Sequence, residues 1–276
     1  MGEDYKSKKE SVQDKEKRLK KILGAYKSVV VAFSGGVDST LLLDMAVSVI
    51  GSRQVLAVTI DLPLVPREEL AEAGELARQN EAEHLVMPFD VLEDRKLKFN
   101  PQDRCYICKK KIYSLLLEVA EKRGYQAVLD GSNADDAEVY RPGLLALREL
   151  AISSPLMEAG LGKEEIRKIS RNRGLQTWHK PAAACLASRV PYGEELKPEK
   201  LSLIAEAENY LKNFGLKKEV RVRLHDNIAR IEVHQSELDL ILSRRKEISY
   251  KLREIGFSYV ALDLDGFRSG SMDLDV

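Results

Sequence analysis

The chain of 276 residues carries 44 lysines and arginines against 44 aspartates and glutamates, which gives a formal net charge of zero. This length suits one large domain or a domain with a smaller companion, and the balanced charge argues against nucleic acid as a main partner. No apolar run approaches the length of a membrane span, and residues 1–21 are charged rather than signal-like, so we expect a cytoplasmic protein without membrane contact.

The first part of the chain alternates apolar runs with helical patterns. A charged helix is expected at 8–26, before this alternation begins. Strands are predicted at 28–33, 54–60, 84–87 and 127–130, and helices at 39–50, 67–79, 107–123 and 163–172. Such alternation indicates a parallel, doubly wound α/β sheet, with functional residues beyond the carboxyl ends of its strands.

Segment 34–39, Ser-Gly-Gly-Val-Asp-Ser, joins the first predicted strand to the following helix. Backbone N–H groups at a helix amino end lack partners and lie at the positive end of the helix dipole, so they attract anions. Gly35 and Gly36 let the backbone approach a phosphate, and Asp38 can hold Mg²⁺ beside it. No lysine stands where a Walker A loop requires one. The alternative is a tight turn with a helix cap and no ligand.

This segment resembles the S-G-G-x-D-S motif of the PP-loop ATP pyrophosphatase superfamily, whose fold is of the adenine nucleotide alpha-hydrolase type. The resemblance implies that ATP is cleaved between its α and β phosphates and that a substrate oxygen is adenylylated, with Asp38 catalytic and bound to Mg²⁺. The ATP-binding residues expected on this basis are Ala32, Ser34, Gly35, Gly36, Val37, Asp38, Ser39, Thr59, Gly131 and Arg141.

Three cysteines are candidates for one metal site, and their odd number makes a structural disulfide set unexpected. Cys105 and Cys108 form a C-x-x-C motif at the start of a helix, where a spacing of three residues places both thiols on one face. With Cys185 they would leave one iron of a [4Fe–4S] cluster open to an external ligand. The alternatives are a redox dithiol beside an unrelated buried cysteine, or zinc completed by His179 or His84.

The pattern changes after Pro191. Helices are predicted at 198–214 and 236–255, and strands at 219–224, 229–233 and 259–264, with a turn at 225–227. These elements form a small α+β unit. We therefore predict a PP-loop ATP pyrophosphatase domain at 1–189 and an α+β substrate-binding or oligomerisation domain at 190–276.

A PP-loop combined with three cysteines indicates sulfur transfer, because a hydrosulfide can displace AMP from an adenylylated carbonyl. Cluster-containing tRNA thiolases share this combination and are the alternative family. Segments at 130–131, 140–143, 188–193, 220–226, 228–232 and 262–270 instead resemble the LarE family, the ATP-dependent sulfur-insertion enzymes of nickel-pincer nucleotide synthesis, from about residue 19 to residue 272.

The LarE resemblance implies thiolation of a carboxylate of pyridinium-3,5-biscarboxylic acid mononucleotide, with ATP, Mg²⁺ and a sulfur donor such as sulfide. It also implies a homo-oligomer and no nucleic-acid partner. Many members sacrifice the sulfur of a single cysteine and are left with dehydroalanine. Cys185 lies in the corresponding segment, but counting back from Arg189 places it one residue off that register. The three-cysteine set resembles members that hold a [4Fe–4S] cluster, so we expect Cys105, Cys108 and Cys185 to be catalytic cluster ligands.

Basic residues of the second part suit a phosphorylated substrate. Arg221 and Arg223 alternate on one predicted strand, so their guanidinium groups share a face and can bind a 5′-phosphate. A solvated strand face opposite Glu232 is the alternative for this pair. The substrate-binding residues expected in all are Ser188, Arg189, Glu208, Arg221, Arg223 and Arg268, and Lys109 is expected to reach the ATP phosphates as a catalytic residue.

Overall fold

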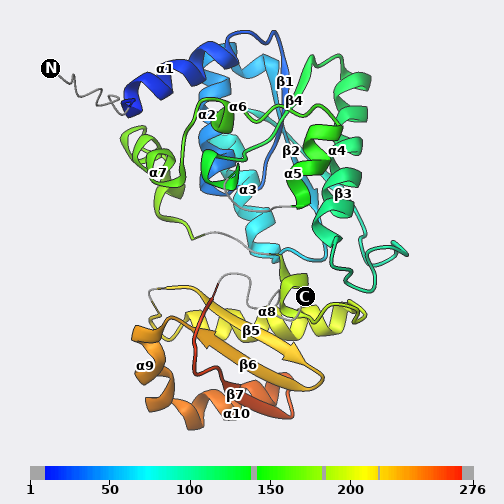
Figure 1. Ribbon diagram of the computed structural model, residues 1–276, viewed down its shortest axis with the longest axis vertical. Coiled ribbons are helices and arrows are strands. Elements are labelled where there is room, and N and C mark those ends of the chain that lie inside the picture. The colour runs from blue at the N-terminus through cyan, green and yellow to red at the C-terminus, as the bar shows by residue number, and fades with distance from the viewer. Residues whose placement is uncertain (1–9, 138–141, 182–184, 217, 269–276) are drawn as a thin grey trace, which may run out of the picture. The chain divides into compact units, whose positions relative to one another are not determined.

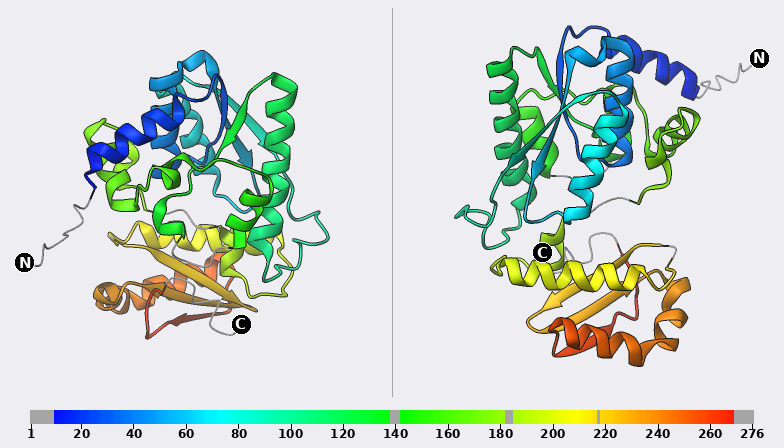
Figure 2. Two further views of the ribbon diagram at one scale, coloured as in Figure 1. Left: turned by 45° about the horizontal axis from the view of Figure 1, so that its top comes forward. Right: turned by 180° about the vertical axis from the view of Figure 1, so that it is seen from behind.

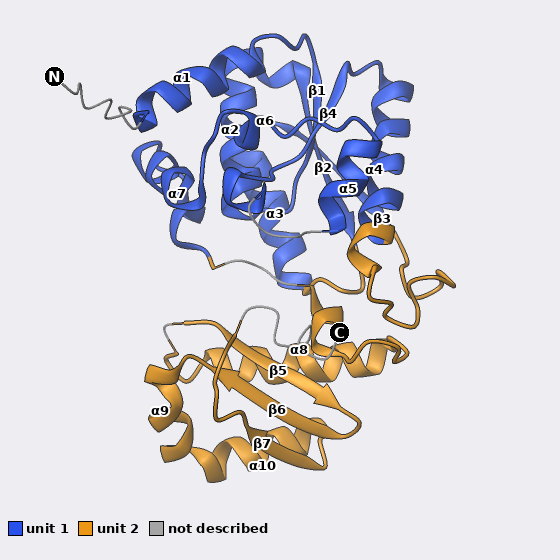
Figure 3. Ribbon diagram, in the orientation of Figure 1, with its two compact units in different colours: residues 1–61, 67–88, 108–180 blue, residues 62–66, 89–107, 181–276 orange. Residues whose placement is uncertain are grey.

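Figure 1 shows the computed structural model, which describes residues 10–137, 142–181, 185–216 and 218–268. Contacts divide the chain into two compact units, coloured separately in Figure 3. Unit 1 comprises residues 1–61, 67–88 and 108–180, and unit 2 comprises residues 62–66, 89–107 and 181–276. Both units are discontinuous in sequence, and the predicted division after residue 189 stays a prediction.

Unit 1 is built on a parallel sheet of four strands in the order β3-β2-β1-β4. The strands are β1 Val29–Ala32, β2 Val55–Asp61, β3 Glu83–Pro88 and β4 Ala127–Leu129. Val29 pairs with both Val55 and Ala127, so β1 is central and its carboxyl end lies where the strand order reverses. In open α/β sheets this switch point is the usual place for a ligand.

Helices cover both faces of this sheet (Figure 1, Figure 2), which confirms the predicted doubly wound α/β class. They are α1 Val12–Leu23, α2 Val37–Ile50, α3 Arg67–Gln79, α4 Arg104–Arg123, α5 Pro142–Glu149, α6 Pro155–Glu158 and α7 Lys163–Asn172. Val29 and Val31 of β1 enter one core with α2, whereas Val30 enters the other with α4. This alternation follows from the two-residue period of a strand.

Unit 2 contains a three-stranded sheet in the order β5-β6-β7. Its elements are α8 Pro198–Lys212, β5 Val220–His225, β6 Ile228–Val233, α9 Leu238–Ser243, α10 Arg245–Ile255 and β7 Tyr259–Leu262. β5 and β6 form the predicted antiparallel hairpin, with Asp226 at a φ of 52° in its turn. β7 adds to β6 in parallel.

The single helix predicted at 236–255 is wrong, because two helices occupy this range. The helical conformation is interrupted at Arg244, where φ is −103° and ψ is 11°. The Ser243 hydroxyl donates to the Leu240 carbonyl oxygen at 2.7 Å, and such local bonds compete with helical bonding. Among the residues the structure describes, no helix is long and apolar enough to cross a membrane.

Candidate functional site

The loop between β1 and α2 is fastened to its neighbours through backbone atoms. The Phe33 N–H donates to the Val58 carbonyl at 2.8 Å. Gly35 has a φ of +68°, and a Cβ built on it would stand 3.2 Å from the Cα and Cβ of Ala73 on α3. Both the left-handed conformation and the close approach of α3 therefore require glycine at this position. Gly36 then caps α2 with an extended backbone.

Serine hydroxyls gather at the amino end of α2. The Oγ atoms of Ser34 and Ser39 lie 3.1 Å apart, and the Gly36 N–H donates to Ser34 Oγ at 3.4 Å. The N–H groups of the first helical turn have no partner within the helix, so this end of α2 carries donors and a positive dipole. Segment 34–39 thus has the donor arrangement that the sequence predicts for a phosphate site.

Asp38 combines a paired and an unpaired carboxylate oxygen. Its Oδ2 accepts a hydrogen bond from Lys163 Nζ at 2.5 Å, whereas Oδ1 is buried and has no partner among the described residues. Burial raises the pKa of Asp38 above its ordinary value, an effect that Lys163 opposes and Asp136 reinforces. An orphaned carboxylate oxygen beside an anion site suits Mg²⁺, a cation that prefers oxygen ligands.

Residues after β4 border the amino end of α2. A Cβ on Gly131 would lie 3.2 Å from the Ser39 backbone nitrogen, so this position needs glycine to admit the helix. The preceding Asp130 is 5% exposed and accepts hydrogen bonds from the Tyr113 hydroxyl and from the Ser132 N–H. Lys109 Nζ lies 3.7 Å from Asp130 Oδ2, which places this predicted catalytic lysine in a network of unit 1.

The hydroxyl of Thr59 is engaged within the protein. It donates to the Phe33 carbonyl oxygen at 2.7 Å and lies 2.8 Å from His84 Nε2, which must therefore carry the proton of that contact. Burial lowers the pKa of His84, so the ring is held neutral. Thr59 thereby supports the start of the loop; its predicted contact with ATP stays a prediction.

In unit 2, Arg189 and Glu208 form a buried bidentate ion pair. Arg189 Nε and Nη2 donate to the two Glu208 oxygens at 2.8 and 2.9 Å, and the two side chains are 3% and 6% exposed. Glu208 on α8 also accepts the Val222 N–H at 3.0 Å. Arg189 Nη1 donates to the Cys185 carbonyl and to Ser188 Oγ. The pair therefore ties the Cys185 segment to α8 and β5.

Arg221 and Arg223 lie on one face of β5, as predicted, but both are buried. Arg223 donates to Glu232 Oε2 through Nε and Nη2 and to the Ser188 carbonyl through Nη1. Arg221 Nη2 donates to Glu219 at 2.9 Å. Desolvation and the neighbouring Arg189 charge lower the pKa of Arg221. Three guanidinium groups, those of Arg189, Arg221 and Arg223, thus lie close together in unit 2, and each also has a carboxylate partner. A phosphate bound by them would share their N–H groups with these carboxylates.

The predicted substrate residue Arg268 lies in a more exposed place. Its side chain is 45% exposed and its Nη2 atom lies 3.1 Å from Asp265 Oδ2. The adjacent Phe267 ring instead stacks on the Arg221 guanidinium, with 5.3 Å from the guanidinium carbon to the ring centroid. Phe267 thus contacts the arginine group, which is Arg189, Arg221 and Arg223, and the sequence did not indicate this contact. Predicted ATP ligand Arg141 lies outside the described residues.

Asn100 joins the segments that carry Cys105 and Cys185. Its side chain is fully buried, and Nδ2 donates to the carbonyl oxygens of Val190 and Pro191 at 2.7 and 3.0 Å. Arg104, the first residue of α4, donates to the Ala187 carbonyl at 3.2 Å. Two buried side chains therefore hold the start of α4 against segment 187–191.

Within the described residues the three cysteines are in the thiol form and none belongs to a disulfide; Cys105 and Cys185 are exposed. Desolvation of the Cys185 thiol raises its pKa; the Arg104 charge opposes this, and the nearby Cys105 adds to it. Cys105 and Cys108 stand three residues apart in α4, as predicted. The described part of the chain gathers no group of three or more potential metal ligands, so a closed cluster site is not preformed there. The donor chemistry of three thiols nevertheless suits iron.

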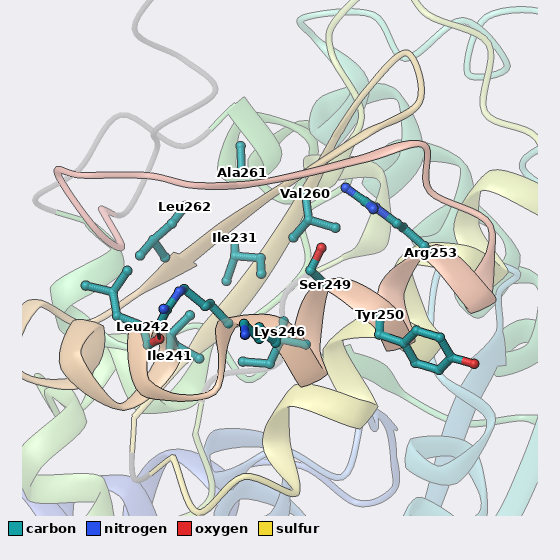
Figure 4. Close-up of a pocket in the computed structure, with 12 residues that line it drawn as sticks. Ile231, Ile241, Leu242, Lys246, Ser249, Tyr250, Arg253, Val260, Ala261 and Leu262 are labelled. Atoms are coloured by element: carbon teal, nitrogen blue, oxygen red, sulfur yellow. Dashed lines mark hydrogen bonds between the residues drawn. The ribbon is translucent and has the colours of Figure 1, made fainter.

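A groove of about 530 Å³ lies in unit 2 between α9, α10 and β7 (Figure 4). Ile241 and Ile248 from the helices and Val260 and Leu262 from β7 give it apolar walls, and α10 adds the polar and charged side chains Arg245, Lys246, Ser249, Tyr250 and Arg253. None of the predicted site residues lines it. We therefore assign the substrate to the arginine group rather than to this groove, and that assignment stays a prediction.

Sequence reasoning missed Lys163 and Lys180. Lys163 begins α7 and pairs with Asp38 across 125 positions of sequence. Lys180 Nζ contacts the Gly35 carbonyl oxygen and Glu72 Oε2. Neither lysine belongs to the S-G-G-x-D-S motif, and only the folding of α7 and its following segment onto the loop reveals them.

A parallel sheet with an S-G-G-x-D-S loop between β1 and α2 defines a PP-loop α/β protein, and a family model described as NAD synthase matches residues 10–100. The chain is 41% identical over 245 residues to pyridinium-3,5-bisthiocarboxylic acid mononucleotide synthase of Lactiplantibacillus plantarum, covering 89% of this chain and 88% of that one. It therefore belongs to the family of that synthase, the LarE family.

Two uncharacterized proteins are also similar. One, from Synechocystis sp., is 38% identical over 264 residues, which cover 95% of this chain and 98% of that protein. The other, from Methanocaldococcus jannaschii, is 34% identical over 243 residues, 88% of this chain and 92% of that protein. The resemblance to LarE stated from the sequence is thereby confirmed, and membership of a PP-loop family implies the use of ATP and Mg²⁺.

Proposed function

We propose that this protein is an ATP-dependent sulfur transferase that converts a carboxylate of pyridinium-3,5-biscarboxylic acid mononucleotide into a thiocarboxylate. The observation that carries the proposal is the 41% identity to the named synthase over 89% of the chain. The loop between β1 and α2 supports the ATP-dependent half of the reaction, and the arginine group of unit 2 supports recognition of the nucleotide phosphate.

In the first step, a substrate carboxylate oxygen attacks the α-phosphorus of ATP. A P–O bond to the carboxylate forms, the bond between the α-phosphorus and the bridging oxygen breaks, and pyrophosphate leaves. The N–H groups at the start of α2 would stabilise the phosphates, and Asp38 Oδ1 would take Mg²⁺. Lys163 would keep Asp38 oriented through the other oxygen.

In the second step, hydrosulfide attacks the adenylylated carbonyl carbon. A C–S bond forms, the C–O bond to AMP breaks, and the thiol proton is released to solvent. Arg221 and Arg223 would hold the 5′-phosphate, while the Arg189–Glu208 pair would fix the strand that presents them and Ser188 would border the site. Arg268 and Lys109 complete the proposed set of substrate and ATP contacts.

The sulfur would come from the three-cysteine segment. Cys105, Cys108 and Cys185 would hold a [4Fe–4S] cluster, which when bound offers an open iron that can carry sulfide. Reduced thiols suit the cytoplasm, where we place the protein, and we expect a homo-oligomer. In the competing scheme Cys185 gives up its own sulfur, which would allow one turnover per chain and would place no sulfur from added sulfide in the product; the Discussion describes the test.

The adenylylation step can be tested without sulfide. Purified protein with Mg²⁺, ATP and labelled pyrophosphate should return label to ATP only when pyridinium-3,5-biscarboxylic acid mononucleotide is added. Unmodified tRNA serves as the competing substrate, and the same nucleotide without its 5′-phosphate serves as the control for the arginine group. Exchange that depends on tRNA and ignores the pyridinium nucleotide would overturn the proposal in favour of a tRNA thiolase.

A further inference from the structure

We infer that Lys180 is a positioning residue of segment 34–39, hereafter the phosphate loop, and that it acts through the peptide that joins Gly35 to Gly36. The inference rests on the ATP-binding part of the proposed function. Lys180 Nζ donates to the Gly35 carbonyl oxygen at 3.3 Å and to Glu72 Oε2 at 2.8 Å, and its side chain is 15% exposed. All of these residues belong to unit 1.

Both ends of Lys180 are held in place. Arg167 of α7 donates to the Trp178 carbonyl at 2.6 Å and to the Lys180 carbonyl at 2.8 Å, which fixes the backbone that carries the lysine. Glu72 holds the ammonium group from α3, and the next residue of that helix, Ala73, packs against Gly35. The ammonium therefore contacts a loop that α3 also supports.

The contact sets the direction of one N–H group. In a trans peptide the carbonyl and the N–H point in opposite directions, so a carbonyl of Gly35 turned to Lys180 turns the Gly36 N–H away from it. That N–H donates to Ser34 Oγ, one of the two serine hydroxyls at the start of α2. Lys180 thus directs the Gly36 donor to the side where the serine hydroxyls lie.

A peptide between two glycines needs such support. Glycine adopts positive and negative φ with similar ease, so neither flanking residue resists rotation of the peptide plane. Rotation by half a turn would present the Gly35 carbonyl oxygen where the Gly36 N–H now stands, and an oxygen would face the phosphate. A cation bound to the Gly35 carbonyl opposes this rotation, because such charge-assisted hydrogen bonds are stronger than neutral ones.

The test uses Lys180→Met, Lys180→Arg and Glu72→Gln in the full chain. The matched control is Lys168→Met, at an exposed lysine of α7. Binding of Mg²⁺ with α,β-methylene-ATP is measured by calorimetry, and thermal melting verifies folding. We expect Lys180→Met to weaken binding about tenfold, Lys180→Arg to restore most of it and Glu72→Gln to have an intermediate effect, with Lys168→Met unchanged.

A spectroscopic measurement separates positioning from direct phosphate contact. The amide nitrogen of Gly36 responds to hydrogen bonding at the preceding carbonyl, so in ¹⁵N-glycine-labelled protein without nucleotide its signal should move in Lys180→Met and return in Lys180→Arg. An unchanged Gly36 signal, or unchanged nucleotide affinity, would overturn the inference. If wild-type protein fails to bind the nucleotide, the proposed function fails, whereas the nucleotide-free spectrum still reports on the Lys180 contact.

Discussion

At the scale of single residues, the site is defined by charged groups whose pairing is unequal. Asp38 has one oxygen on Lys163 and one buried oxygen without a partner among the described residues, whereas Arg189 and Glu208 satisfy each other with two hydrogen bonds. The unpaired oxygen of Asp38 can therefore bind a ligand, whereas both oxygens of Glu208 already accept hydrogen bonds from Arg189. We therefore interpret Asp38 as a group for chemistry and the Arg189–Glu208 pair as a support.

Replacing Asp38 by asparagine should leave the fold intact and slow pyrophosphate release roughly 100-fold, because Mg²⁺ loses its anionic ligand. The measurement is pyrophosphate release with the pyridinium nucleotide, together with the melting temperature. In the wild type, the rate should fall on acidification at a higher pH than an ordinary aspartate would dictate, because burial raises the pKa of Asp38 and protonation removes the metal ligand. Near-normal release by Asp38→Asn would remove this residue from the mechanism.

In protein that carries no iron, iodoacetamide can reach the exposed Cys185, so the rate of alkylation should be set by the thiolate fraction of this residue. Desolvation raises its pKa, so the thiolate fraction at pH 8 is smaller than that of an unhindered thiol, and the rate should continue to climb as the pH rises past the ordinary thiol value. Peptide mass spectrometry measures each cysteine separately. Alkylation of Cys185 as fast as that of a small-molecule thiol at pH 8 would contradict this account.

At the scale of elements, the start of α2 is where β1, β4 and α3 meet around glycines. Because Gly35 has no side chain, α3 can pack closely against it, and Gly131 allows the same close approach by the first turn of α2. The sequence predicted this junction well, because an apolar strand, a glycine pair and a helix follow each other within about twenty residues. α7 was also predicted at its observed bounds, from a strongly amphipathic pattern.

What the sequence did not predict is contact between distant elements. Lys163 and Lys180 reach the loop only after α7 folds onto α2, and no local pattern signals that meeting. Glu208 was expected among the substrate-binding residues, but the sequence did not predict that it pairs with Arg189, which lies 19 positions away outside α8. The helix is interrupted at Arg244, next to a Ser243 hydroxyl that donates to the Leu240 carbonyl oxygen. The spacing of apolar residues does not reveal such a hydrogen bond.

Gly131→Ala should weaken ATP binding about tenfold while the protein still folds. The added methyl would stand 3.2 Å from the Ser39 nitrogen and push the first turn of α2 away from the phosphates. Gly74→Ala is the matched control, because its Cβ would meet nothing closer than 3.8 Å. Calorimetry measures nucleotide affinity for both variants. Equal affinity of Gly131→Ala and wild type would show that α2 does not approach the ligand as described.

The Arg189–Glu208 pair gives an independent prediction of stability. Arg189→Met should lower the free energy of unfolding by about 3–5 kcal/mol, because Glu208 is left buried without its cation. Urea denaturation measures the change, and the double variant Arg189→Met with Glu208→Leu should recover much of it. A loss below about 1 kcal/mol in the single variant would mean that the pair is open to solvent.

At the scale of the whole molecule, the chain is divided between two units, each carrying one part of the proposed reaction. Unit 1 holds the phosphate loop with Asp38, and unit 2 holds the arginine group with Cys185. The sequence predicted both parts and the α+β character of the second. It did not predict that 62–66 and 89–107 join unit 2, because these short segments have no pattern of their own.

The arginine group should select the substrate without affecting ATP. Arg221→Met is the sharper variant, since Arg221 pairs with Glu219, whose side chain is 26% exposed, whereas Arg223 pairs with the fully buried Glu232. We expect the KM for the pyridinium nucleotide to rise at least about tenfold, because one charge-assisted contact to the phosphate is lost, while the KM for ATP stays unchanged. An unchanged KM for the nucleotide would return Arg221 to a structural role.

We propose above that this protein transfers sulfur to a pyridinium carboxylate and converts ATP to AMP and pyrophosphate as it does so. The most direct measurement is mass spectrometry of the nucleotide after anaerobic incubation with reconstituted protein, ATP, Mg²⁺ and isotopically heavy sulfide. We expect a thiocarboxylate that carries the heavy isotope and forms over many turnovers with equal amounts of AMP and pyrophosphate. We expect no such product when any one of Cys105, Cys108 and Cys185 is replaced by alanine. Light sulfur in the product, one turnover per chain and a loss of H₂S at Cys185 would rule out sulfur delivery by a cluster, and an absence of thiolated nucleotide would overturn the proposed sulfur transfer.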